Sequence, residues 1–266
     1  MALARADLES ILRARQLDRT LTTALPPLDP RDESALAPSG VTALDARLGG
    51  GFPRGQLSEL AGPRSSGRTS LVLRMMAAAT ARGELVAIVD ALDMLDVESA
   101  ASAGVNLSQL LWIRGHVVVN PGLCRDLNQR ALEQAIRALT LVLQAGNFGL
   151  VAFDVAEAPA DAVRRLPFTT WMRLQRIIEG SRTACVLAGS EAMARSSAGL
   201  TLRLAAGIKD QGLGMRRDQG AGISREQGPG SRFGNLLFDG LDFDARIVRA
   251  RAREREEASV ALSTSA

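Results

Sequence analysis

The chain has 266 residues, of which 46% are hydrophobic and 23% are charged, and its formal net charge is +3. This length and apolar content fit a globular protein with one large α/β core and a small appendage. The small net charge makes a weak case for nucleic acid as a partner, so the distribution of the arginines matters more than their number.

Neither a membrane nor an oxidising compartment is indicated by the sequence. No apolar run approaches the ~18 residues of a membrane span, and the start, MALARADLES, lacks a signal-peptide pattern. We therefore expect a cytoplasmic protein that has no membrane partner. Cys124 and Cys185 are too few and too distant for a disulfide framework or a metal site. Cys185 lies in an apolar strand and is predicted to be a buried free thiol.

Residues 1–40 are predicted to form an N-terminal helix and a linker. Residues 6–17 carry an incomplete apolar stripe at helical spacing. The proline-rich residues 24–40 are typical of an extended linker. The helix could dock on its own domain or on another protein.

Residues 41–206 are predicted to form the core, because apolar strand patterns alternate there with helix patterns. Helices are expected after Arg68 and at residues 96–103, 125–145 and 169–181. This alternation predicts an α/β fold with a mostly parallel central β-sheet covered by helices on both sides. The expected strands are residues 57–61, 85–90, 110–113, 150–154 and 184–189.

Residues 207–266 differ in composition and are predicted to form a third region. A glycine-rich loop is expected up to residue 234. Residues 236–238 and 243–248 resemble the two strands of a C-terminal β-hairpin joined by an Asp-Gly turn. The charged end of the chain is predicted to be a flexible, fraying tail.

One stretch carries the pattern of a phosphate-binding loop: an apolar strand, a glycine-bounded turn and a helix. The expected pattern is G-x-x-x-x-G-K-[ST], and this chain has arginine in place of the lysine. The loop is either a degenerate nucleotide-binding loop whose amides still bind phosphate, or simply a tight strand-to-helix turn. Its residues are Gly62, Pro63, Arg64, Ser65, Ser66, Gly67, Arg68, Thr69 and Ser70.

From Thr42 to Val105 the chain resembles the core of the bacterial RecA recombinases. The shared features follow one another in the same order: Leu-Asp, a glycine-rich turn, Gly-Pro-x-Ser-Ser-Gly, and a strand that ends in Asp-Ala. The resemblance continues more weakly through Asp154 and the strand at 184–189. It implies a RecA-like core, in which Asp154 matches the strand-end (Walker B) acid that supports magnesium.

The departures from the RecA pattern fall on the nucleotide site. Arg68 is wider and longer than the lysine point charge that it replaces. Leu92 falls where the family has the glutamate that activates water, and it cannot accept a proton. Ser99 falls where an aromatic stacks on adenine, and Ser190 falls near the glutamine that senses the γ-phosphate. We therefore expect a pseudo-ATPase with no catalytic residue, no metal site and no required cofactor, ATP with magnesium included.

The segments that match the two DNA-binding loops of RecA are short, at residues 155–167 and 191–199. Arg164 and Arg165 lie in the first, Arg195 lies in the second, and Arg203 lies beyond it. These four arginines are candidate DNA contacts, since phosphate binding needs only positive charge and reach. The alternative is a solvated arginine face.

RecA-like chains of this size, with eroded nucleotide motifs and a divergent tail, resemble the ImuA family of the damage-induced bacterial mutagenesis cassette. This resemblance implies an accessory role in SOS translesion synthesis. It also implies an ImuB-like Y-family polymerase homologue, RecA, and single-stranded or duplex DNA as partners, and leaves the oligomeric state open. Two alternatives remain: an ATP-binding, DNA-dependent ATPase of the recombinase superfamily, and a regulator that caps or disrupts RecA filaments.

Three other features have plain structural interpretations. Asp90, Asp93 and Asp96 are predicted to cap the following helix and meet solvent rather than to bind a metal. Trp112 and Trp171 are expected in the core or an interface, and the absence of tyrosine counts against base stacking. His116 is predicted to be a polar loop residue.

Overall fold

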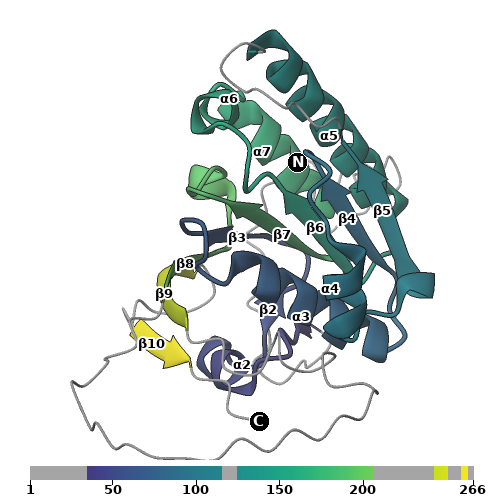
Figure 1. Ribbon diagram of the computed structural model, residues 1–266, viewed down its shortest axis with the longest axis vertical. Helices are drawn as coiled ribbons and strands as arrows, with labels where there is room; N and C mark the ends of the chain where they lie inside the picture. The colour runs from purple at the N-terminus through teal and green to yellow at the C-terminus, as the bar shows by residue number, and fades with distance from the viewer. Residues whose placement is uncertain (1–34, 116–124, 207–242, 251–258, 263–266) are drawn as a thin grey trace, which may run out of the picture.

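The computed structural model describes residues 35–115, 125–206, 243–250 and 259–262 (Figure 1). His116, Cys124 and the predicted N-terminal helix lie outside these residues, as does the whole of the predicted glycine-rich loop. The helices are α2 (Thr42–Leu48), α3 (Arg68–Ala81), α4 (Val97–Ser102), α5 (Arg125–Ala145), α6 (Ala160–Arg164) and α7 (Phe168–Ile178). The strands are β1 (Leu36–Ala37), β2 (Phe52–Pro53), β3 (Leu57–Ala61), β4 (Val86–Asp90), β5 (Leu110–Arg114), β6 (Leu150–Asp154), β7 (Ala184–Gly189), β8 (Leu200–Ala206), β9 (Phe243–Ala250) and β10 (Ser259–Leu262).

Eight of these strands form one sheet in the order β10-β9-β8-β3-β7-β6-β4-β5, and β1 pairs with β2 separately. The six strands from β8 to β5 are parallel, whereas β9 and β10 are joined to them in antiparallel fashion. The prediction of a mostly parallel sheet is therefore confirmed. Parallel strands need crossover connections, and α-helices provide them after β3, β4, β5 and β6.

The helices cover the sheet on both faces, so the molecule has three layers (Figure 1). On one face α2, α3 and α4 pack on the sheet through an apolar cluster that includes Leu44, Met75 and Ala100. On the other face α5 and α7 pack through a second cluster that includes Leu139 and Trp171. Each helix contributes one apolar stripe, which burial against the sheet removes from water.

The C-terminal strand pair differs in detail from the predicted hairpin. β9 covers the second predicted strand, whereas the first strand and its Asp-Gly turn lie outside the described residues. β9 pairs instead with β8 on one side and with β10 on the other. Ser259–Leu262 forms β10 within the segment that we expected to fray. The sheet of the core thus continues into the last residues that the structure describes.

The core contains elements that the sequence analysis did not name, α6 and β8 among them, and one buried group matches its prediction. The short helix α6 lies within the predicted loop 155–167, and β8 follows the predicted loop 191–199. Cys185 is a buried free thiol, and burial raises its pKa to about 12. Within the described ranges no helix is long and apolar enough to cross a bilayer.

Candidate functional site

The carboxyl ends of β3, β4, β6 and β7 lie at one edge of the sheet. Asp90 at the end of β4 is in register with Asp154 at the end of β6, and Ala61 of β3 is in register with Gly189 of β7. The phosphate-loop residues follow Ala61 directly. This edge is where ligands bind in open parallel α/β sheets, so the predicted site residues gather where the topology favours a site.

The loop between β3 and α3 has the predicted strand–turn–helix geometry. Gly67 adopts a left-handed conformation with φ of 82° just before α3, and Ser65 also has a positive φ of 61°. A side chain at Gly62 would lie about 2.5 Å from the Leu204 carbonyl oxygen, so only glycine fits there. No side chain caps the N-terminus of α3. Its first N–H groups therefore remain available to an anion.

Arg68, the first residue of α3, is buried, with a relative exposure of only 5%. Burial lowers the pKa of its guanidinium, while the nearby carboxylates of Asp154 and Glu157 act in the opposite direction. Its Nη1 atom has no hydrogen-bond partner among the described residues, and the same is true of the buried Ser66 hydroxyl. Arg68 thus places a permanent positive charge beside the two carboxylates.

Asp154 has an unusual environment for a carboxylate. Burial raises its pKa to about 6, against a backbone hydrogen bond from Ala156 that lowers it, and the Asp90 carboxylate raises it further. Asp90 itself is buried and accepts hydrogen bonds from the Leu95 amide and the Trp112 indole N–H, at 2.7 and 3.3 Å. The two acids at the strand ends therefore repel each other, and the Arg68 charge opposes that repulsion.

A cavity of about 130 Å³ adjoins these acids and the start of α3. Thr69, Leu92 and Met94 line it together with Asp90 and Asp154. At the rim, the exposed Arg64 forms an ion pair of 3.2 Å with Glu157. Leu92 therefore faces the space that a water-activating glutamate would occupy in the RecA pattern.

Magnesium–ATP is the ligand that the RecA resemblance implies, and the side chains at this edge do not fit its hydrolysis. Leu92 has no group that could accept a proton from water. The buried Arg68 guanidinium attracts the Asp154 carboxylate, which would otherwise support a magnesium ion. The main chain of the loop still fits a phosphate, as do the two unpartnered groups of Ser66 and Arg68. Anion binding and catalysis are thus separable here.

The three acids that follow β4 have three different partners. Asp96 accepts hydrogen bonds from the Ser99 amide and hydroxyl and caps α4, as predicted. Asp93 pairs with both ends of the Arg114 guanidinium, at 2.7 and 2.6 Å. The prediction that Asp90 caps the helix and meets solvent is wrong, because its side chain is buried against Leu95 and Trp112.

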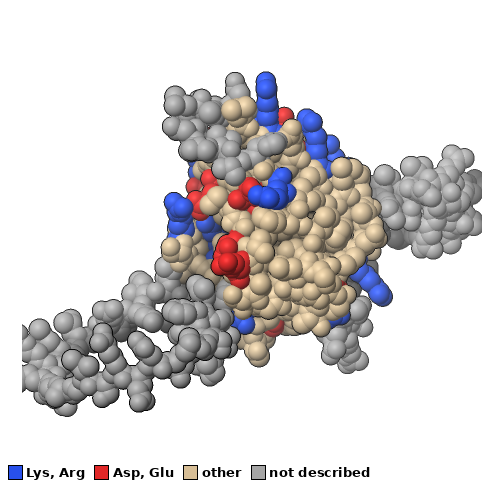
Figure 2. Space-filling model, turned by 45° about the vertical axis from the view of Figure 1, so that its right-hand side comes forward, with Lys and Arg blue, Asp and Glu red and all other residues tan. Residues whose placement is uncertain are grey.

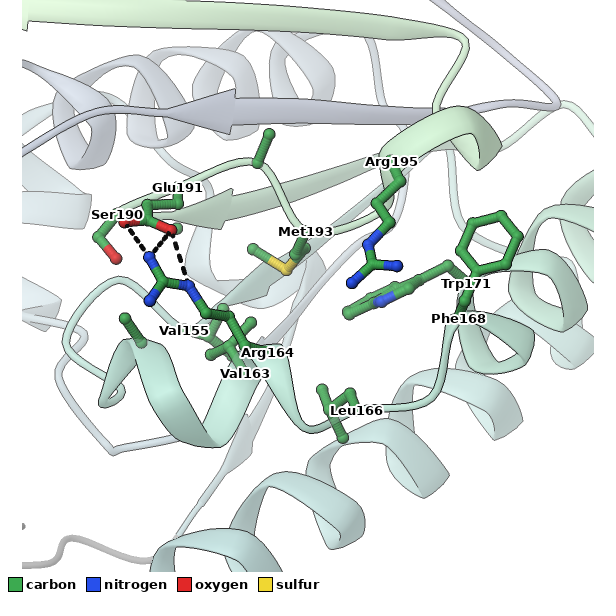
Figure 3. A pocket seen from close by; sticks show the side chains of 13 residues that line it. Val155, Val163, Arg164, Leu166, Phe168, Trp171, Ser190, Glu191, Met193 and Arg195 are labelled. Carbon is green, nitrogen blue, oxygen red and sulfur yellow. Dashed lines mark hydrogen bonds and ion pairs between the residues drawn. The ribbon is translucent and has the colours of Figure 1, made fainter.

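A second cavity, of about 260 Å³, lies at the same edge where β6 and β7 end (Figure 3). It adjoins both of the short segments that match DNA-binding loops. Arg164 and Arg195 line it, whereas Arg165 and Arg203 are exposed residues that do not. Arg164 is paired in bidentate fashion with Glu191, at 2.6 to 3.2 Å (Figure 3). The structure therefore brings two of the four candidate arginines together.

Buried Glu59 holds one wall of this second cavity, and the sequence reasoning missed it. Its Oε1 atom accepts the amide protons of Met193 and Ala194, both at 2.6 Å, and its Oε2 atom accepts the Thr201 hydroxyl proton at 2.8 Å. A carboxylate within the apolar strand LSELA is the signal that could have found it, since a buried charge needs partners. Glu59 fixes the segment after β7 from the strand that precedes the phosphate loop.

Charged side chains are scattered on the face that comes forward in Figure 2, where uncharged residues dominate. This view turns the β5 side of the molecule toward the reader. Leu85, Leu107 and Leu111 are among the exposed large apolar residues of the chain, and Leu111 lies on the edge strand β5. The described residues of this face form no continuous basic stripe of the kind that binds a nucleic-acid backbone.

Comparison with known proteins supports a RecA-like family. The model of the RecA N-terminal domain matches residues 28–119. Protein RecA of Clavibacter michiganensis is 38% identical over 131 residues, which are 49% of this chain and 32% of that protein. Protein RecA of Acholeplasma laidlawii is 38% identical over 122 residues (46% and 33%), and that of Prochlorococcus marinus is 47% identical over 74 residues (28% and 20%). The matched region spans about a third or less of these curated relatives.

Proposed function

We propose that this chain is a non-hydrolysing, RecA-like accessory protein of SOS, damage-induced translesion DNA synthesis. In this proposal it acts by binding protein partners, namely an ImuB-like polymerase homologue and RecA, with DNA as an additional ligand. The similarity to RecA supports a role of the repair and recombination type. The accessory role is the step that goes beyond that similarity.

The burial of Arg68 is the observation that carries the proposal. A loop lysine must reach the β- and γ-phosphates of a bound nucleotide, but the Arg68 side chain is buried beside Asp154 and Glu157. The absence of a base at Leu92 then removes general-base help worth roughly 10²–10⁴ in rate. Because both the phosphate contact and the general base are missing, we favour a site that does not hydrolyse ATP over one that hydrolyses it slowly.

The second loop region also supports a protein-binding role. Arg164, a candidate DNA contact, has its charge neutralised by Glu191. Binding to a nucleic-acid backbone depends on several uncompensated cations, and this pairing reduces their number at the edge of the sheet. Strand exchange is therefore poorly supported by the described residues.

The proposal is tested by two measurements made together. The purified chain should hydrolyse ATP at background rates with magnesium and single-stranded DNA, under conditions in which a RecA protein is active. Deletion of the gene should lower the damage-induced mutation frequency, and a plasmid copy should restore it. Recombinase-like hydrolysis, or an unchanged mutation frequency in the deletion strain, would contradict the proposal.

A second candidate function is an ATP-binding, DNA-dependent ATPase that uses Arg68 in place of lysine. The observation in its favour is the uncapped N-terminus of α3, beside the unpartnered Arg68 Nη1 and Ser66 hydroxyl. Isothermal titration with ATP and magnesium separates the two candidates. Tight, magnesium-dependent binding together with turnover on DNA would favour the ATPase.

A further inference from the structure

The cavity at the ends of β6 and β7 combines an apolar floor with a cationic rim. Trp171, Met193 and Leu166 are buried and supply much of the floor. Arg195 lies at the rim, and Phe168 stands beside Trp171 (Figure 3). A hollow of this kind can take an apolar body that carries a negative charge at one end.

The charges at the rim do not cancel. Glu191 lies in a bidentate pair with Arg164, so neither is left to attract a ligand strongly. The Arg195 guanidinium, by contrast, pairs with no carboxylate in the part of the chain that the structure describes. One positive charge therefore remains over an apolar hollow, which favours an acidic ligand of small charge over a polyanion.

Arg195 is held at this rim by its backbone. Its φ of 49° is left-handed, which costs energy for a residue with a side chain. Its carbonyl oxygen accepts a hydrogen bond of 2.6 Å from Arg249 of β9, and Glu59 binds the two amides just before it. Strained, over-determined residues of this kind cluster at ligand sites.

The volume of about 260 Å³ is smaller than the roughly 300–1,000 Å³ of most small-molecule pockets and fits one large side chain better than a nucleotide. Aromatic anchors in such pockets dominate many protein interfaces, and an arginine beside the anchor forms charge-assisted hydrogen bonds with a carboxylate. We propose that this cavity, which we call the β6–β7 pocket, docks an acidic peptide segment of a partner protein through one aromatic side chain. This inference rests on the proposed function, because it names the partner-binding surface.

The test is a selection from a random twelve-residue peptide library on the full-length chain. Enriched peptides should share one aromatic residue flanked by Asp or Glu, and a labelled copy should bind in fluorescence anisotropy. Arg195→Ala should weaken binding at least about tenfold, the scale of one lost charge-assisted contact. Arg195→Lys should recover part of the loss. Ala192→Trp, an exposed wall residue, should block the pocket.

Arg203→Ala is the matched control, because it removes another exposed arginine, one that does not line the pocket. It should leave peptide binding unchanged, and thermal unfolding should show that all four variants are folded. Basic or non-aromatic peptides, or binding that is indifferent to Arg195→Ala and Ala192→Trp, would overturn the inference. So would an oligothymidylate that displaces the peptide and depends on Arg195 and Arg203 alike, since the pocket would then be a nucleic-acid contact.

Failure of this inference can be told apart from failure of the proposed function. If the polymerase homologue or RecA binds wild type, Arg195→Ala and Ala192→Trp equally, the partner role stands and the pocket is not its surface, which overturns the inference. If neither protein binds while the selected acidic peptides still require the pocket, the inference stands and the proposed partners are wrong.

Discussion

Two cavities lie along the same carboxyl edge of the sheet, and they differ in how their charged side chains are paired. At the phosphate loop, the chain places its own cation, Arg68, beside the acids at the ends of β4 and β6. At the β6–β7 pocket, the cation Arg195 faces an apolar space and has no carboxylate partner among the residues described. The first site thus sets a cation of the chain beside its acids, whereas the second leaves its cation without a carboxylate. We therefore take the phosphate loop as evidence of the relationship to RecA, and we expect partner binding at the β6–β7 pocket.

The two sites are joined by β3, and breaking that connection should have the largest effect. Glu59→Ala leaves the amides of Met193 and Ala194 buried without an acceptor, which should cost about 3 kcal/mol of unfolding free energy. Urea denaturation measures this loss. Peptide binding at the β6–β7 pocket should fall with it, because the wall of the pocket loses its support.

Glu59→Gln is the control for this change. Its amide oxygen can still accept from both backbone N–H groups, and its NH₂ can donate to Thr201, so the cost should be about 1 kcal/mol. Equal losses for the alanine and glutamine variants would show that the charge of Glu59, rather than its hydrogen bonds, supports the wall.

The first site should carry a measurable pH dependence through Asp154. Its pKa is raised from 3.8 to about 6, so the folded state binds the proton more tightly than the unfolded chain. The contribution of Asp154 to stability is then greatest below pH 3.8 and falls as pH rises to about 6, by up to about 3 kcal/mol. Asp154→Asn should flatten this descent in urea titrations made across that range.

Asp93→Asn is the comparison variant, since the hydrogen bond from Arg114 lowers the pKa of Asp93 rather than raising it. It should leave the descent up to about pH 6 intact. A descent that survives in Asp154→Asn would place the responsible proton elsewhere, and the picture of two repelling acids would need revision.

How far Arg68 blocks the loop can be tested by restoring the lysine. Wild type should show a smaller shift in melting temperature with millimolar magnesium–ATP than Arg68→Lys does. Arg68→Lys frees the space beside Asp154 and should gain about 1–2 kcal/mol from the nucleotide, the value for a ligand present at roughly ten times its Kd. Hydrolysis should stay at background, because Leu92 is unchanged.

Arg68→Ala separates the two roles of the side chain, since it also frees the space but supplies no cation. It should respond to nucleotide less than Arg68→Lys does. If the wild type is stabilised as strongly as the lysine variant, the loop is a working nucleotide site and the contrast between the two cavities disappears.

The main elements of the core could be predicted because their boundaries are local. β3, β6, β7 and α5 have the predicted limits, since each apolar run or stripe ends at a glycine or a charged residue. The helix α6 was missed because five residues give no periodic signal. The strand β8 was also missed, although Leu200, Leu202 and Leu204 alternate with Thr201 and Arg203 in the pattern of a strand.

The site could be predicted only in part, because its chemistry depends on contacts between distant residues. Arg68 stands out in the loop motif, but its burial follows from packing that no motif encodes. The pairing of Arg164 with Glu191 joins residues 27 positions apart and changes a candidate DNA contact into a neutralised pair. The conformation of Arg195 likewise depends on Arg249, 54 residues away.

The smallest expected effect tests whether the ion pair between Arg164 and Glu191 prevents the rim of the β6–β7 pocket from binding nucleic acid. Glu191→Gln removes the carboxylate and leaves Arg164 as a second uncompensated cation beside Arg195. Binding to single-stranded DNA should then tighten, and the slope of log K against log salt should steepen by about 0.7, the value for one additional phosphate contact. Arg164→Ala in the same background should return the slope to its wild-type value. An unchanged slope would mean that Glu191 does not control the charge of the rim, and that the preference for an acidic peptide comes from the apolar floor alone.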